Sequence, residues 1–475
     1  MSDKPNILFL ITDQQQKNTV IGSQCKTPNI DRLRNEGVFF SNAYSVNPIC
    51  SPTRASLFTG LLPHNHGMVD CTHNVEEYRA NYRPEKDTFT QHLKEDGYRL
   101  GYYGKWHVER TMDLSQFGFD EYLTEADARE FPMTIRKKLT VEQYGYNDRV
   151  VCGVYQEDST KTEEHFIYSK GVEFIKDSQE NQAQPWCLFL STNGPHDPYL
   201  VPKELYNRYD PKEIEKPVNF DDPMEDKPAI YRRIKSVWQD LQWEDYQKVI
   251  ACYYAYCTLI DTQVGRILKT LEETGQLENT IIVYTTDHGD LMGGHGLFCK
   301  GVPPFEEVYN VPLIIRWPQG NIGNKVLDTY VTTCDLAPTL LDMAGCSPMS
   351  GIDGGSVVPY LKGCPDLPKR VAFSEFHGQR LAYSQRIVWK DNYKYVYNGF
   401  DYDEFYDLNK DPYELHNLIG EPAYQDRVID LCREMWQIVK KTGDSSFLQT
   451  EYYMFRFAPV GPEQPKVKSV YNKGA

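Results

Sequence analysis

The sequence predicts an α/β fold: a large, mostly parallel sheet flanked by helices, followed by a smaller C-terminal α+β domain. In the first two-thirds of the chain, short apolar segments alternate with helical segments, which is typical of a parallel sheet covered on both faces. After about residue 361, short and closely spaced apolar segments indicate antiparallel strands. The 475 residues exceed the usual size of a single core. We therefore expect a large domain at 1–365 and a small domain at 366–475.

The large domain is expected to begin with a buried strand over 6–12, which ends at Asp13. A helix should start at Thr27-Pro28, because threonine caps helices and proline suits their first turn, and Gly37 should end it. The polar stretch 200–226 predicts a surface excursion. The other elements expected here are helices over 87–96 and 246–274, and strands over 99–103, 186–191, 281–286 and 313–317.

The small domain should contain strands over 371–376, 383–388 and 394–397. A helix over 426–441 is expected to follow, because its apolar residues recur at helical spacing. These apolar residues are Val428, Leu431, Cys432, Met435 and Val439.

Composition excludes several classes of protein. The net charge of -16 argues against a nucleic-acid binder, which would usually be basic. On such a negative protein, any site for an anionic substrate must be a local cluster of cations. No apolar run is long enough to span a membrane, and 7–11 is too short for the core of a signal peptide. With Met1 as the start, we expect a cytoplasmic protein. Apart from Cys50, the twelve cysteines are expected to be mostly buried free thiols.

The segment Cys50-Ser51-Pro52-Thr53-Arg54 is expected to open a helix that Gly60 ends. Ser51 is a good N-cap and Pro52 a good first helical residue, so Cys50 should lie just before the helix. Amide groups and the helix dipole favour negative charge at this end, where Arg54 adds a cation. Taken alone, the pattern also fits an ordinary helix start.

Two pairs of polar residues follow buried strands: Asp13-Gln14 and Asp287-His288. Sites in open α/β sheets form beyond the carboxyl ends of strands, so these side chains should converge. Their oxygen-rich set suits a hard cation such as Ca²⁺ or Mg²⁺ and lacks the spacing of a structural zinc site.

Three further loops supply cations and imidazoles. Lys105 and His107 follow a strand two positions apart and should face one pocket. His196 lies in Asn-Gly-Pro-His-Asp-Pro over 193–198, and Lys300 lies in the glycine-rich stretch 294–301, where it could reach an anion. Each of these also fits an ordinary loop when taken alone.

The order, spacing and strand-end placement of these motifs resemble the formylglycine-dependent sulfatases of the alkaline phosphatase superfamily. The resemblance extends from Asn6 into the C-terminal domain, and it makes 1–365 the catalytic domain. Further segments similar to the family are Val311-Pro312-Leu313, Asp335-Leu336-Ala337-Pro338-Thr339, Phe405-Tyr406-Asp407-Leu408, Asp411-Pro412 and the stretch 414–418.

The resemblance implies that a formylglycine-generating or anaerobic sulfatase-maturing enzyme oxidises Cys50 to formylglycine. The hydrated aldehyde would then attack the sulfur of a sulfate ester and later expel sulfate. Arg54 would steady the diol oxygens, while Lys105 and Lys300 would hold the sulfate. His107 would act as the base and His196 as the acid. A divalent metal, Ca²⁺ with Mg²⁺ as the alternative, would be held by Asp13, Gln14, Asp287 and His288.

The chain departs from the family pattern at Gln14 and His288, where many members have an acid and an asparagine. Both residues also occur in the related phosphonate monoester hydrolases and phosphodiesterases, which tend to lack a pair such as Lys105 and His107. We therefore prefer a sulfate-ester hydrolase over a phosphonate hydrolase, with an inactive binder of sulfated glycans as the third alternative. The expected substrate is a small sulfated carbohydrate, with choline sulfate and aryl sulfates open.

Overall fold

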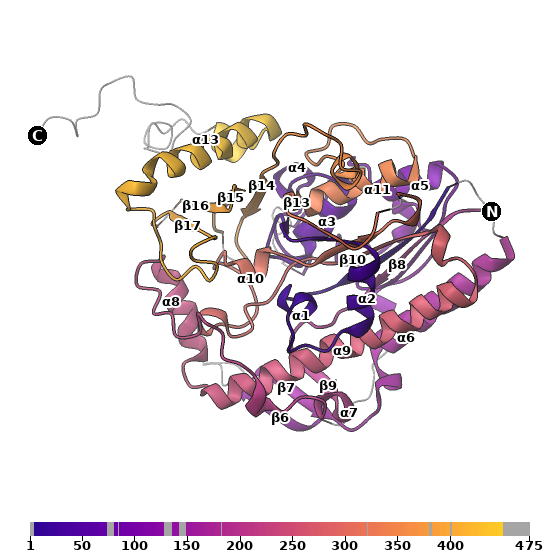
Figure 1. Cartoon of the computed structure of the whole chain (residues 1–475), viewed down its shortest axis with the longest axis horizontal. Coiled ribbons are helices and arrows are strands. Elements are labelled where there is room, and N and C mark those ends of the chain that lie inside the picture. Colours follow the sequence, from indigo (N-terminus) through magenta and orange to yellow (C-terminus); the bar gives the residue numbers. More distant parts are fainter. Residues whose placement is uncertain are drawn as a thin grey trace, which may run out of the picture.

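The centre of the protein is an eight-stranded sheet, seen in a computed structural model that describes residues 4–449 except 74–79, 84, 128–134, 142–148, 182, 321, 380–381 and 400. The strand order is β12-β2-β11-β10-β1-β8-β4-β5 (Figure 1). Most neighbouring strands are parallel, and β11 alone runs against its neighbours β10 and β2. The predicted sheet is therefore confirmed. The strands are β1 (Asn6–Thr12), β2 (Val38–Phe40), β4 (Arg99–Gly104), β5 (Glu121–Leu123), β8 (Trp186–Ser191), β10 (Thr280–Thr286), β11 (Leu313–Arg316) and β12 (Lys325–Leu327).

Helices cover both faces of this sheet, because the central strands are apolar on both sides. Along β1, Phe9 packs in one core cluster and Leu8 in the other. The first face is covered by α3 (Cys50–Thr59), α5 (Phe89–Glu95) and α11 (Leu336–Ala344). The opposite face, in the lower half of Figure 1, is covered by α2 (Pro28–Glu36), α6 (Glu163–Ser178) and α9 (Trp243–Glu273).

Helix ends follow the local rules with small shifts. Thr27 precedes α2 and Gly37 follows it, as predicted. Helix α5 starts at Phe89 rather than 87, because Thr88 and Gln91 form a capping box. The shorter elements are α1 (Asn18–Ile21), α4 (Pro63–His66), α8 (Ala229–Lys235), α10 (Glu306–Tyr309), α12 (Val358–Leu361), α14 (Ser445–Leu448), β3 (Ala43–Tyr44) and β13 (Val331–Thr332).

The C-terminal part forms an antiparallel sheet packed against α13 (Gln425–Thr442), as predicted, but the sheet has a fourth strand in addition to the three expected (Figure 1). It contacts the large sheet's loops, because the Asn47 side chain donates a hydrogen bond of 2.7 Å to the Glu375 carbonyl. The division at 365/366 stays a prediction, and 450–475 lie outside the described residues. The strands are β14 (Ala372–Phe376), β15 (Gln385–Lys390), β16 (Tyr393–Asn398) and β17 (Glu404–Asp407).

The stretch 200–226 is not wholly a surface excursion. It enters β9 (Tyr199–Pro202), which pairs with β7 (Arg149–Tyr155), and β7 pairs with β6 (Ile135–Val141). Helix α7 (Lys203–Tyr206) follows. The prediction missed this small sheet because the pairing of β9 with β7 joins segments about fifty residues apart, and no local pattern indicates such a pairing.

Candidate active site

The ends of β1 and β10 place two buried carboxylates side by side. Asp13 and Asp287 follow these parallel strands, and neither side chain is exposed. Gln14 has a φ of 65°, which turns the chain so that its backbone N–H donates to the Asp287 Oδ1 at 3.2 Å. The predicted convergence of these strand-end residues is confirmed.

Helix α3 brings Cys50 to the same place, with one correction to the predicted cap. The helix begins at Cys50 itself and Ile49 is the extended N-cap residue, held by its N–H donating to the Asn47 Oδ1 at 2.9 Å. Ser51 does not cap the helix, because its hydroxyl instead accepts the Thr72 N–H at 3.1 Å. Gly60 ends the helix with a φ of 66°, as predicted.

The Cys50 sulfur lies among cations and metal-type ligands. It is 3.1 Å from the Lys300 Nζ, 3.3 Å from the His288 Nε2 and 3.8 Å from the Asp13 Oδ1. A hydrogen bond from the Cys71 thiol, together with Lys105 and Lys300, outweighs burial and holds the pKa of Cys50 well below its usual value. The pocket therefore favours negative charge on whatever group stands at position 50.

Arg54 joins α3 to the sheet from one turn further along. Its guanidinium is buried and donates to the Asp287 Oδ2 at 2.8 Å. A second nitrogen donates to the Lys105 carbonyl at 2.9 Å and to the Ser191 hydroxyl at 2.8 Å. The remaining terminal nitrogen lies 3.6 Å from the Asp13 Oδ2. The side chain thus fixes the ends of three strands around Cys50.

The two lysines keep the Asp13 carboxylate ionised. The Lys105 Nζ lies 2.6 Å from the Asp13 Oδ2, and the Lys300 Nζ lies 3.9 Å from the Asp13 Oδ1. Burial and the Cys50 sulfur would raise the pKa of Asp13, but Lys105, Lys300 and His196 outweigh them and lower it. An ionised carboxylate at Asp13 is the form that binds a metal ion.

These residues fit a hard divalent cation. Ligand atoms of Asp13, Cys50, Asp287 and His288 all lie within 4.8 Å of one another. The Gln14 amide nitrogen donates to the Asp290 Oδ2 at 2.6 Å, which leaves the Gln14 Oε1 buried without a hydrogen bond among the described residues. Two carboxylates and an unsatisfied amide oxygen are the donors that Ca²⁺ and Mg²⁺ prefer.

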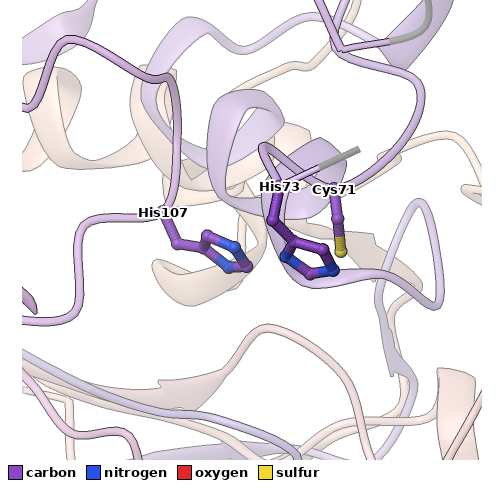
Figure 2. Close-up of side chains that lie close together, drawn as sticks. All are labelled: Cys71, His73 and His107. Atoms are coloured by element: carbon purple, nitrogen blue, oxygen red, sulfur yellow. The ribbon is translucent and has the colours of Figure 1, made fainter. Parts of the chain in front are cut away.

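The two predicted proton-transfer histidines lie at the rim of this cluster. His107 has a φ of 50°, and β4 ends at Gly104, so the alternation of an extended strand does not reach it. Its ring stacks on that of His73, and the Cys71 sulfur lies close to both rings (Figure 2). The His196 Nδ1 lies 2.6 Å from the Asp197 carbonyl oxygen, and a quarter of its side chain is exposed.

The structure also brings in residues that the sequence did not single out. Asp290 and Asp197 both accept hydrogen bonds from the Gln14 amide, and Arg149 pairs with Asp197 at the rim. Asp290 follows Asp287 closely enough that strand-end reasoning could have included it. Glu125 accepts the His107 N–H at 2.9 Å, and Cys71 contacts Cys50, but no local pattern marks either residue.

Two family models match the chain. The family model described as sulfatase matches residues 5–346. A second model, described as the C-terminal part of N-sulphoglucosamine sulphohydrolase, matches residues 293–441.

Individual proteins that are similar to this chain agree with the sulfatase family match. The chain is 30% identical over 463 residues to an arylsulfatase of Clostridium perfringens, covering 91% of this chain and 93% of that one. It is 25% identical over 528 residues to an N-acetylglucosamine-6-O-sulfatase of Bacteroides thetaiotaomicron, covering 95% and 89%. The crystal structure of a phosphonate monoester hydrolase of Agrobacterium radiobacter matches with a TM-score of 0.77 at 24% identity, covering 92% and 96%, which shows a shared fold.

Proposed function

The chain belongs to the sulfatase family of the alkaline phosphatase superfamily, and from this premise we propose that it removes sulfate from a small sulfated carbohydrate through a formylglycine formed at Cys50. Sulfate-ester hydrolysis is the activity of the family. The observation that supports the proposed nucleophile is the position of the Cys50 sulfur, 3.1 Å from the Lys300 Nζ and 3.8 Å from the Asp13 Oδ1. The partner required is a maturing enzyme that oxidises Cys50.

The proposed metal ligands are Asp13, Gln14, Asp287 and His288, with Ca²⁺ as the expected ion and Mg²⁺ as the alternative. When bound, such an ion polarises the sulfate oxygens and lowers the pKa of an attacking hydroxyl. The His288 Nδ1 lies 2.9 Å from the Gly289 carbonyl and donates to it, so the Nε2 lone pair faces the cluster. The carboxylates of Asp13 and Asp287 supply the negative charge.

The remaining residues act on the substrate and its protons. Lys105 and Lys300 neutralise the charge that grows on the sulfate oxygens. The Lys105 ammonium lies 2.6 Å from the Asp13 Oδ2, and the Lys300 ammonium lies 3.1 Å from the Cys50 sulfur. Arg54 steadies the oxygens at position 50 through its remaining terminal nitrogen. His107 takes a proton from the remaining hydroxyl of the diol at position 50, and this deprotonation expels sulfate. His196, whose side chain is a quarter exposed, protonates the oxygen of the leaving alcohol.

The choice of a carbohydrate rests on relatives. One of them is named as an N-acetylglucosamine-6-O-sulfatase. Another is named as an arylsulfatase and a third as a choline-sulfatase. Aryl sulfates and choline sulfate are therefore the substrates against which a sulfated carbohydrate is compared.

The test is a comparison of kcat/KM for an aryl sulfate and an aryl phosphonate that share one leaving group, using protein matured at Cys50. We expect the sulfate to be turned over faster, and Cys50→Ala to be inactive on both. A phosphonate preference of orders of magnitude would reverse the assignment, and unchanged turnover by Cys50→Ala would refute the nucleophile. Turnover of a panel of 6-O- and N-sulfated glucosamines, compared with that of choline sulfate, then tests whether the substrate is a sulfated carbohydrate.

A further inference from the structure

A second group of metal-ligand side chains lies next to the nucleophile. Its members are Cys71, His73 and His107, whose Sγ and imidazole nitrogen atoms lie within 4.8 Å of one another. Figure 2 shows the three side chains next to each other, on the loop after α4 and on the loop after β4. The two imidazole rings stack with their centroids 5.7 Å apart. The proposed reaction assigns no task to Cys71 or His73.

The backbone holds both loops in place. The Thr72 N–H donates to the Ser51 hydroxyl at 3.1 Å, and the Arg110 Nε donates to the Thr72 carbonyl at 2.9 Å. The His107 N–H donates to the Glu125 Oε1 at 2.9 Å. These hydrogen bonds hold the backbone at Thr72 and at His107, and the ligand atoms of the three side chains already lie within 4.8 Å of one another. Rotations about the side-chain bonds can therefore bring them to one ion.

The chemistry of this group differs from that of the oxygen-rich site. One thiolate and two imidazoles are ligands for Zn²⁺ and similar transition metals, and three protein ligands leave a fourth position for water. The His107 Nδ1 is buried and makes no hydrogen bond among the described residues. We infer that Cys71, His73 and His107 form a Zn²⁺ site, separate from the Ca²⁺ or Mg²⁺ site, and that Zn²⁺ bound there inhibits the enzyme.

The burial of the three residues gives the ion a path. His73 is exposed, His107 is half-buried and Cys71 is buried, so the group leads inward from the surface toward Cys50. Binding releases the Cys71 thiol proton to solvent, because the thiolate is the ligand. The inhibition rests on the proposed function, since a bound ion occupies the nitrogen lone pair of His107 that the reaction uses as a base.

The binding test uses Cys50→Ala protein, which removes the neighbouring thiol, in excess Ca²⁺ to fill the oxygen-rich site. Co²⁺ serves as the spectroscopic probe. One equivalent should produce a thiolate-to-cobalt charge-transfer band. Adding Cys71→Ser should abolish the band, and adding His73→Ala should weaken binding at least about tenfold. Cys364→Ser and His416→Ala, at exposed positions, are the matched controls and should leave the band unchanged.

The inhibition test uses matured protein with Cys50 otherwise intact. Zn²⁺ should inhibit it in excess Ca²⁺, and His73→Ala should need at least about tenfold more Zn²⁺ for the same inhibition. Equal inhibition of the two proteins, or a cobalt band that survives Cys71→Ser, would overturn the inference. A cobalt band in a protein that turns over no sulfate ester would support the metal site and refute the proposed function, so the two failures are distinct.

Discussion

Replacing Arg54 with leucine tests whether the guanidinium organises the site. The side chain is 1% exposed and donates to the Asp287 Oδ2, the Lys105 carbonyl and the Ser191 hydroxyl. Leucine keeps the α3 helix and part of the volume, but it leaves the Asp287 carboxylate buried without its cation.

The magnitude follows from that uncompensated charge. Breaking a buried ion pair by removing one partner costs about 3–5 kcal/mol, which a domain with about 5–15 kcal/mol of stability survives. We expect Arg54→Leu to lose that much free energy of unfolding and to lower kcat/KM at least about a hundredfold, comparable to the loss of one oxyanion donor. Arg54→Lys should recover little, because lysine places all its donors on one nitrogen and lacks the planar fork that reaches separated acceptors.

Arg386→Leu is the matched control. This guanidinium is also fully buried and pairs with the Asp444 Oδ2 at 2.7 Å, but in the C-terminal sheet. Denaturant unfolding in chelator measures stability, and turnover at 25 °C measures activity. Both variants should lose similar stability, while Arg386→Leu keeps its activity. If Arg54→Leu unfolds within about 1 kcal/mol of the parent protein, or if both variants lose the same activity, the reasoning is wrong.

Three further predictions concern pH, charge and metal. Burial alone would lower the pKa of His64, but its ion pair with Glu375 raises it to about 9. Stability from this pair is therefore present below pH 6.5 and is lost as pH rises toward 9. Denaturant unfolding should show the free energy of unfolding falling by about 3 kcal/mol over this pH range, and His64→Gln should not show this fall. Lys300→Gln should lower kcat/KM by about 10²–10³, while Lys369→Gln at the surface should not; equal effects would contradict the assigned role. In thermal unfolding, Ca²⁺ at a hundred times its Kd should stabilise the metal-free protein by about 2.7 kcal/mol, and Asp287→Asn should abolish this gain. A gain that persists in Asp287→Asn would place the ion elsewhere.

Local rules predicted the parts of the fold whose causes are local. The segment 6–12 was recognisable as a buried strand because its residues 7–11 are all apolar. Helix α2 lies between Thr27 and Gly37, as the capping rules predict. The pairing of β9 with β7 was missed, because it joins segments that are distant in the sequence. Among the helices of the described chain, none is both long and apolar enough to cross a membrane.

The site was predictable where it depends on strand ends and not where it depends on side-chain direction. Asp13 and Asp287 converge because their strands are parallel neighbours. The helix start was placed two residues late, at Pro52 instead of Cys50, because Ser51 looked like a cap but its hydroxyl accepts the Thr72 N–H instead. The contact of Cys71 with Cys50 depends on a loop fold that no sequence pattern indicates.

The most direct measurement of the central claim is the mass of the tryptic peptide 35–54, which contains Cys50 and ends at Arg54. The protein should come from a host that carries the maturing enzyme, with a known modified protein as control in the same cells. Loss of the Cys50 sulfur and gain of an aldehyde is the predicted result. An unmodified thiol beside a modified control would contradict the formylglycine mechanism.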